Sequence, residues 1–112
     1  MKRGDVVLAL FPNSDLVSAK TRPALVVQRD ALNGGLPQII LAMITSRIAR
    51  AGHPSRVTVL LSSPEGKHSG LLTDSVVMTD NLATVKEAAI SSVIGSLPMS
   101  RINKALRHSL DL

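Results

Sequence analysis

The sequence contains no cysteine, no tryptophan and no tyrosine, and it has a single phenylalanine among 112 residues. Without cysteine, the protein can have no disulfide framework, thiol nucleophile or thiolate zinc site. With Phe11 as its one aromatic residue, it cannot offer a platform of rings on which unpaired bases stack. Any contact with RNA or DNA must therefore depend on arginine, on backbone groups and on shape.

Long hydrophobic runs are also missing. The apolar stretches, such as residues 39–44, are far shorter than the roughly 20 residues of a membrane-spanning helix. The N-terminal residues carry no signal-peptide or lipidation pattern. Because 45% of the residues are hydrophobic, the chain is too apolar to be disordered. We expect one cytoplasmic domain over residues 1–112, without membrane contact.

Acidic residues are few: 8 Asp and Glu stand against 13 Lys and Arg, which gives a net charge of +5. In so small a domain this excess favours an anionic partner, either a nucleic acid or an acidic protein segment. The same excess also suits a protein that basic residues merely keep soluble. Composition alone leaves both interpretations open.

Short β-branched segments separated by turn residues dominate the first two-thirds of the chain. We expect strands at residues 6–10, 23–27, 39–45, 56–61 and 71–79, the last of them interrupted near Asp74. The segment 39–45 is so apolar that both of its faces should be covered. Residues 62–66 carry a turn signal, and residues 84–90 fit a strand or a helix equally well.

The last segment has a different period. Between Leu97 and Leu110 the apolar residues recur at positions 99, 102, 106 and 110, which is helical spacing. Ser96 can act as the N-cap, with Pro98 in the first turn. The polar residues that this spacing turns to solvent are Arg101, Lys104, Arg107 and His108. Many short strands followed by one helix predict a mainly β fold with helices, a small curled barrel closed by a C-terminal α-helix.

Common catalytic motifs are absent. The chain has no phosphate-binding loop, no Gly-x-Gly-x-x-Gly and no His-Glu-x-x-His. Its three histidines, His53, His68 and His108, show no ligand spacing, so we expect neither a metal site nor a cofactor. No serine lies in a nucleophile elbow, although counting residues does not exclude a Ser-His-Asp triad.

Two places stand out. In Lys20-Thr21-Arg22-Pro23 a cation pair lies where a polar loop meets a buried strand, and in Ile44-Thr45-Ser46-Arg47 an apolar strand ends in two hydroxyls and an arginine. An arginine at the start of a strand is often only solvated, and hydroxyls at a strand end often satisfy local backbone groups. Neither place decides a function by itself.

Together with their surroundings, these segments resemble the MazF/PemK (Kid) family of toxins. The resemblance covers essentially the whole chain, and the Arg22-Pro23 and Thr45-Ser46 pairs are its most specific part. The matching segments, in order, are Gly4-Asp5-Val6-Val7, Phe11-Pro12, Lys20-Thr21-Arg22-Pro23-Ala24-Leu25-Val26-Val27, Thr45-Ser46, Gly70-Leu71, Asp74-Ser75-Val76-Val77, Thr79-Asp80-Asn81-Leu82 and Ile94-Gly95-Ser96-Leu97.

The resemblance implies a type II toxin with an SH3-like barrel that forms homodimers. Members of this family cut single-stranded RNA at short sequences without a metal and are held inactive by a cognate antitoxin, with which they can also bind operator DNA. It also implies that Arg22 and Thr45 form the catalytic centre, with Ser46 beside them. The loop of residues 11–21 would cover the site.

The other site residues follow less directly. Asp80 matches an acidic position that part of the family uses in RNA binding or catalysis, and Lys20 lies beside Arg22. The usual Gly-Ser-Glu of the first loop reads Asn13-Ser14-Asp15, the loop is slightly longer, and a histidine that some members carry there is missing. Met78 replaces an arginine of the Kid branch, so the sequence is more similar to the MazF branch. The general base stays unassigned, with Asp15 and Asp80 as candidates.

The chemistry suits these residues. The 2′-hydroxyl of RNA can attack the adjacent phosphorus, which leaves a 2′,3′-cyclic phosphate and a 5′-hydroxyl and needs no protein nucleophile. The planar fork of Arg22 matches two phosphate oxygens and stays protonated, and Thr45 can add a hydroxyl hydrogen bond. DNA lacks the 2′-hydroxyl, so it can bind but not react.

Basic residues follow the Thr-Ser segment. Arg47, Arg50, His53 and Arg56 either form a rim that guides the RNA backbone or are simply solvated at a hairpin tip. The same groove would suit an acidic, disordered antitoxin segment. Two other functions remain open: a non-catalytic toxin of the same shape that poisons DNA gyrase, and an inactive member that binds DNA only in operon regulation.

Overall fold

Six strands, two α-helices and one short 3-10 helix make up the described part of the chain, which comprises residues 1–12, 18–30, 37–48 and 51–112 of a computed structural model. In chain order they are β1 (Asp5–Pro12), β2 (Ala19–Val26), β3 (Gln38–Thr45), β4 (Arg56–Val59), α1 (Pro64–Ser69), β5 (Ser75–Lys86), the 3-10 helix η1 (Glu87–Ala89), β6 (Ile90–Ser96) and α2 (Ser100–Leu110).

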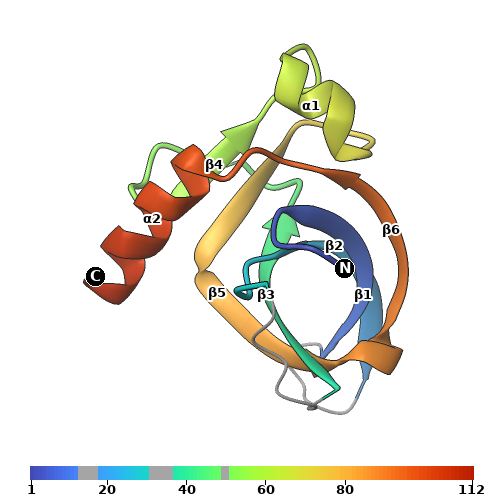
Figure 1. Ribbon diagram of the computed structural model, residues 1–112. Coiled ribbons are helices and arrows are strands. Elements are labelled where there is room, and N and C mark those ends of the chain that lie inside the picture. The colour runs from blue at the N-terminus through green and yellow to red at the C-terminus, as the bar shows by residue number, and fades with distance from the viewer. Residues whose placement is uncertain (13–17, 31–36, 49–50) are drawn as a thin grey trace.

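The strands form one antiparallel sheet in the order β4-β5-β3-β2-β1-β6. The sheet curls strongly, and α2 lies outside the curl beside β4 and β5 (Figure 1). The expectation of a mainly β fold with helices, in which the C-terminal helix packs on the sheet, is therefore confirmed. Between the described residues, no strand pairing joins β4 to β6.

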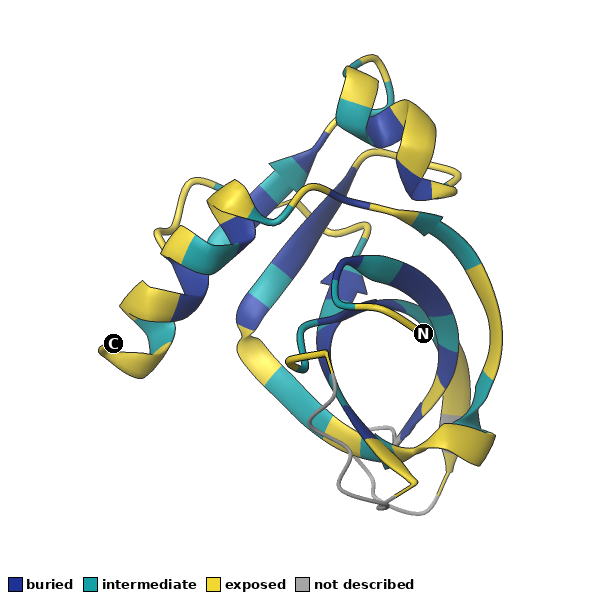
Figure 2. Cartoon of the chain, in the orientation of Figure 1, coloured by how far each residue is buried: buried dark blue, intermediate teal, exposed yellow. Residues whose placement is uncertain are grey.

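Two hydrophobic clusters include residues of β3, a strand that is buried or half-buried over most of its length (Figure 2). Ile39 and Leu41 belong to one cluster, Ala42 and Ile44 to the other, and the neighbours Leu41 and Ala42 are both fully buried. Since successive side chains of a strand point to opposite faces, this burial confirms that both faces of the segment are covered. The second cluster also holds Ile102, Ala105 and Leu106 of α2.

Several expected strand ends differ from the observed ones. β2 begins at Ala19, four residues before its expected start and within the segment expected to be a loop. The segment 56–61 is a strand only up to Val59, because the turn signal that follows is the start of α1. Ser63 is the N-cap of this helix, and its side-chain oxygen accepts a hydrogen bond from the backbone nitrogen of Gly66 at 3.1 Å. Pro64 stands in its first turn. Serine and proline in this order begin a helix as readily as they form a turn.

The expected strand 71–79 is wrong in its first half. β5 begins at Ser75 and runs to Lys86, while residues 71–74 connect α1 to it. The ambiguous segment 84–90 becomes the end of β5 and the 3-10 helix η1. β6 was not expected at all. It pairs only with β1 at the edge of the sheet, and its exposed residues Ser91, Ser92 and Val93 break the alternation that marks a half-buried strand.

The C-terminal helix is shorter than the spacing predicts. α2 begins at Ser100, and Ser96, the expected N-cap, is instead the last residue of β6. The backbone nitrogen of Leu97 donates to the carbonyl of Gly4 at 2.9 Å, which ties this stretch to the start of β1 before the helix can form. The residues expected to face solvent are exposed, namely Arg101, Lys104, Arg107 and His108. No helix among the described residues is long and apolar enough to span a membrane.

Candidate active site

The segments around Arg22 and Thr45 meet in one groove. Arg22 belongs to β2, and Thr45 is the last residue of β3. The groove has a volume of about 670 Å³, and five of the predicted site residues line it: Lys20, Arg22, Thr45, Ser46 and Arg47. Its other described lining residues are Leu8, Thr21, Pro23, Ile44, Gly70, Leu71, Leu72, Thr73, Ser75 and Ile94.

The pairing of β2 with β3 explains this meeting. Ala24 is paired with Met43, the last described pair at this end of the two strands. Continued by two residues, the same register sets Arg22 opposite Thr45. Residues opposite one another on antiparallel strands project to the same face of a sheet. Both residues therefore lie just beyond the last pair of β2 and β3, where the strands separate, and both line the groove that opens there.

Arg22 extends from a well-supported backbone. On its other side β2 pairs with β1, where Ala9 is opposite Arg22 and Leu8 is opposite Pro23. Pro23 fixes the backbone directly after Arg22. The Nε atom of Arg22 is buried, and the side chain as a whole is half-buried. This support limits the directions in which the planar guanidinium can present its donors.

The hydroxyl of Thr45 has a defined orientation. Its Oγ1 accepts a hydrogen bond from the backbone nitrogen of Arg47 at 3.1 Å. A hydroxyl has one donor hydrogen in addition to its acceptor sites. Because one acceptor site already bonds the backbone, the hydrogen can point into the groove toward an anionic ligand. The hydroxyl thus both satisfies the local backbone and remains able to donate.

The opposite wall of the groove comes from the connection between α1 and β5, a part that sequence reasoning did not assign to the site. Gly70 ends α1 with a φ of 74°, and a Cβ there would collide with the carbonyl oxygen of Ile94 on β6. The backbone nitrogen of Leu71 donates to the buried Ser69 hydroxyl at 3.1 Å. The only signal for this wall in the sequence is the family motif that includes Gly70-Leu71 and Asp74-Ser75.

Positive charge dominates the groove. Its described lining includes three cations, Lys20, Arg22 and Arg47, and no carboxylate or imidazole. Several hydroxyls, among them Thr21, Thr45 and Ser46, stand beside the cations. Cations and hydroxyl donors without a competing carboxylate form a site for an anion such as a phosphodiester.

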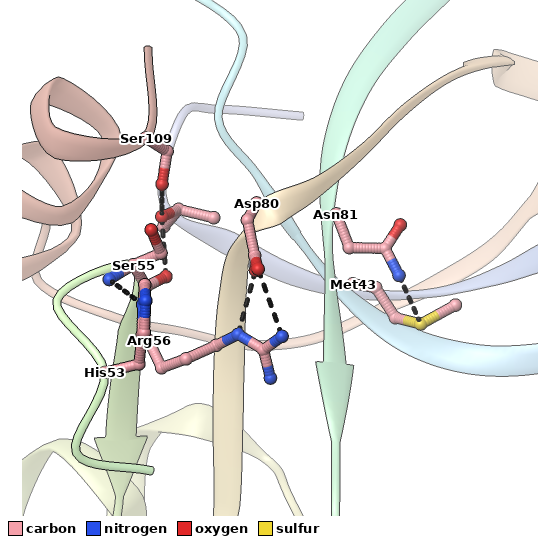
Figure 3. A network of polar contacts seen from close by, with 8 residues as sticks. Met43, His53, Ser55, Arg56, Asp80, Asn81 and Ser109 are labelled. Atoms are coloured by element: carbon pink, nitrogen blue, oxygen red, sulfur yellow. Dashed lines mark hydrogen bonds and ion pairs between the residues drawn. The ribbon is translucent and has the colours of Figure 1, made fainter. Parts of the chain in front are cut away.

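Asp80 and Arg56 lie together outside this lining (Figure 3). Arg56 donates to the two carboxylate oxygens of Asp80, at 2.8 Å from Nε and 3.1 Å from Nη2. These hydrogen bonds from Arg56 are the main reason why the pKa of Asp80 is lowered. Asp80 also lies five residues beyond Ser75 on β5, roughly 16 Å at 3.3 Å per residue. The structure therefore does not bring Asp80 to Arg22 and Thr45.

A bulge in β5 places Asp80 outside the groove lining. Ala42 pairs with Leu82, but the next residue of β3, Met43, pairs with Met78, so residues 79–81 bulge from the ladder. Within the bulge Thr79 turns inward and is fully buried, while Asp80 is exposed.

Hydrogen bonds hold this bulge in place (Figure 3). The Thr79 hydroxyl donates to the carbonyl of Ser55 at 2.7 Å and shares a hydrogen bond of 2.7 Å with Ser109 on α2. The bulge thereby joins β5 both to the start of β4 and to the C-terminal helix.

The remaining predicted residues fall elsewhere. Asp15 and Arg50 lie outside the described residues, as do residues 13–17 of the segment 11–21 expected to cover the site. Phe11 at the start of that segment is a core residue of β1. His53 accepts a hydrogen bond from the backbone nitrogen of Ser55 and packs edge-on against His108, with 6.0 Å between ring centroids. Within the described ranges, no three acidic or histidine side chains gather as they would around a metal ion.

Similarity to known proteins extends over nearly the whole chain. The family described as "PemK-like, MazF-like toxin of type II toxin-antitoxin system" matches residues 2–110. The chain belongs to this family. The resemblance indicated by the motifs is thereby confirmed. Among curated relatives of this PemK-like toxin, Endoribonuclease EndoA of Bacillus subtilis (strain 168) is 33% identical over 116 aligned residues, which cover 100% of this chain and 96% of that protein.

Solved structures show the same fold. Mycobacterium tuberculosis toxin MazF-mt6 has a TM-score of 0.73 and 26% identity, covering 96% of the PemK-like toxin chain and 97% of its own. An endoribonuclease in complex with its cognate antitoxin, from a mycobacterial species, has a TM-score of 0.74 and 24% identity, with 100% of this chain and 96% of that chain covered. The likeness extends over nearly the full length of each chain.

Proposed function

We propose that this PemK-like toxin is a sequence-selective endoribonuclease that cleaves single-stranded RNA such as mRNA, with Arg22 and Thr45 as its catalytic residues. The observation that supports this most is the groove, which both residues line among cations and hydroxyls, with no carboxylate in the described lining. The family supplies the toxin role, and the relative EndoA is named an endoribonuclease.

In the proposed reaction the scissile phosphate lies between Arg22 and Thr45. The 2′-hydroxyl gives its proton to solvent water and its oxygen bonds to phosphorus. The bond from phosphorus to the 5′ oxygen breaks as that oxygen takes up a proton from water. The products are a 2′,3′-cyclic phosphate and a 5′-hydroxyl. Arg22 donates to the phosphate oxygens as their charge grows, and the Thr45 hydroxyl donates beside it. One such donor is typically worth ~3 to 4 kcal/mol in the transition state.

The remaining groove residues bind and orient RNA. Lys20 and Arg47 contact backbone phosphates on either side of the scissile bond, and the Ser46 hydroxyl adds a hydrogen bond. Charge stabilisation by Arg22 fills the role that a metal ion has in other nucleases, so we propose cleavage without a metal or other cofactor. We assign no general base, since Asp80 is engaged by Arg56.

We further propose that the curled sheet is an SH3-like barrel, that the protein is a homodimer and that a cognate antitoxin inhibits it. The family is defined as the toxin of a toxin-antitoxin pair, and the related mycobacterial endoribonuclease was solved with its antitoxin. The cations Lys20, Arg22 and Arg47 would attract an acidic antitoxin segment as well as RNA. Such a segment would block the path of the substrate.

Incubation of the purified protein with a long single-stranded RNA in EDTA tests the proposed nuclease. We expect discrete fragments that end in a 2′,3′-cyclic phosphate, and we expect Arg22→Ala to lose this activity while keeping the thermal unfolding transition of a folded protein. Intact RNA with the wild-type protein would overturn the proposal. A gyrase supercoiling assay and an operator-binding assay would then separate the two non-catalytic alternatives.

A further inference from the structure

The two walls of the groove differ in chemistry. The wall built by the ends of β2 and β3 carries all three described cations, Lys20, Arg22 and Arg47. The opposite wall, from the connection between α1 and β5, contributes Leu71 and Leu72 to the lining and no charged side chain. Phosphate groups bind to the first kind of surface, whereas the faces of bases bind to the second.

Leu72 is the most exposed large hydrophobic residue among those described. Its exposure is 95%, compared with 83% for Leu112 near the C-terminus. A leucine held almost wholly in water at the edge of a groove gives up the stabilisation that burial would bring. Apolar residues that gather on a surface mark contact sites, and Leu72 shares the groove lining with Leu71 and Ile94.

The backbone around Leu72 is held firmly. Leu71 bonds through its nitrogen to the Ser69 hydroxyl on one side. On the other side the carboxylate of Asp74 accepts a hydrogen bond from the backbone nitrogen of Leu61 at 2.8 Å, and the Ser75 hydroxyl donates to the carbonyl of Thr73 at 2.9 Å. Leu72 therefore stands between two anchored ends, which keeps it at the groove without support from a ligand.

The composition of the chain excludes stacking of a base on an aromatic ring in this groove. Bases on single strands are most often stacked against aromatic rings. Here the one aromatic residue is Phe11, which is 2% exposed in the core, and the described lining of the groove contains no aromatic ring. A base that enters this groove can therefore pack against aliphatic side chains or a guanidinium plane, but not against an aromatic ring.

We propose that Leu72, supported by Leu71, is a base-contacting residue that sets substrate preference next to the scissile phosphate. This inference rests on the proposed nuclease function. A groove of about 670 Å³ has room for a nucleotide-sized ligand. With its phosphate at Arg22 and Thr45, the nucleotide extends its base toward the apolar wall. Leu72 thus covers one face of that base and excludes water from it.

The test uses single-stranded RNA oligonucleotides randomised at the positions that flank the cleaved bond. We compare kcat, KM and base preference at each position for four proteins: wild type, Leu72→Ala, Leu72→Met and the control Leu112→Ala. Leu112 matches Leu72 as an exposed leucine but lies outside the groove lining. Both substituted positions, 72 and 112, are on the surface, so we expect unfolding temperatures close to that of the wild type.

We expect Leu72→Ala to raise KM about tenfold and to reduce discrimination among bases at one flanking position by a similar factor, with kcat changed less than about threefold. Leu72→Met, which keeps an apolar contact, should remain within about threefold of wild type, as should Leu112→Ala. Unchanged KM and base preference in Leu72→Ala, while wild type cleaves, would overturn this inference alone. In that case a weakened dimer or antitoxin complex would assign Leu72 to a protein contact. If wild type does not cleave RNA, the proposed nuclease function fails and this inference fails with it.

Discussion

Arg22 and Thr45 stand opposite each other in the register that pairs Ala24 with Met43, at the point where β2 and β3 separate. Each residue is held by the strand on its other side, because Arg22 is paired with Ala9 of β1 and Thr45 with Val76 of β5. A site built on paired strands keeps its side chains in place more firmly than a site built on connections. The separation of the same strands opens the space that a phosphate needs between the two residues.

This arrangement predicts that the geometry of the Arg22 side chain matters as much as its charge. Lysine at position 22 keeps the charge but loses the planar fork that binds two phosphate oxygens. We expect Arg22→Lys to lower kcat/KM for RNA cleavage about 100-fold and Arg22→Ala about 1,000-fold, in line with the cost of one transition-state donor. Single-turnover cleavage of a labelled RNA measures both values.

Arg107→Lys, on the exposed face of α2, is the matched control and should cleave like wild type. Full activity in Arg22→Lys would show that only the charge is used. Full activity in Arg22→Ala, with a folded protein, would remove Arg22 from the reaction.

The Thr45 hydroxyl is expected to act as a hydrogen-bond donor to the phosphate. Valine has the same shape without the hydroxyl, and a hydrogen bond to a charged group is worth about 1.5 to 3 kcal/mol. We therefore expect Thr45→Val to lower kcat/KM about 10- to 100-fold, whereas Thr45→Ser should stay within about threefold of wild type. If Thr45→Ser were as slow as Thr45→Val, the methyl group and its packing, and not the hydroxyl, would explain the loss.

The salt dependence of RNA affinity should distinguish cations that line the groove from cations elsewhere on the surface. Each phosphate contact to a single strand contributes about 0.7 to the slope of log K against log salt concentration. We expect Arg47→Ala and Lys20→Ala each to reduce this slope by about that amount, and Arg107→Ala to leave it unchanged. The measurement is the affinity for an RNA that carries a 2′-deoxy sugar at the cleaved bond, between about 50 and 200 mM salt. Equal changes in all three variants would mean that net charge alone attracts RNA.

Local sequence patterns were sufficient for part of this fold. β1, β3 and the second half of β2 are runs of apolar residues, and the spacing of Ile102 and Leu106 marks α2. β6 carries no such pattern, because an edge strand with exposed serines buries too little to alternate. α1 is a six-residue helix whose start, Ser63 and Pro64, has the same residues as a turn.

The candidate site, like the fold, could be predicted from the sequence only in part. Arg22 and Thr45 could be predicted because their motifs are local and matched a known family. The Leu72 wall could not be predicted, since its position depends on the close packing of Gly70 and Gly95, where α1 meets β6. The pairing of Arg56 with Asp80 depends likewise on the bulge in β5, and neither long-range contact has a local sign in the sequence.

The ion pair between Arg56 and Asp80 predicts a pH dependence of stability. Arg56 lowers the pKa of Asp80 in the folded protein, so the folded state favours the ionised carboxylate more than the unfolded state does. The contribution to stability is therefore present above the ordinary aspartate pKa of about 3.9 and is lost as the pH falls through the lowered folded-state pKa. Because the Asp80 side chain is 40% exposed, solvent screening limits it to about 0.5 kcal/mol.

We expect Asp80→Asn to lower the free energy of unfolding by about this amount at pH 7 and to match wild type at the acid end of the range. Urea unfolding from pH 7 downward gives both values. A cycle with Arg56→Gln and the double variant isolates the pair, since Arg56→Gln should have almost no further effect in the Asp80→Asn background. A coupling energy of zero at pH 7 would mean that the short contact adds nothing to stability. Cleavage of RNA should stay within about threefold of wild type in Asp80→Asn, because a residue outside the groove cannot take the proton of the 2′-hydroxyl at the distance that general base catalysis requires.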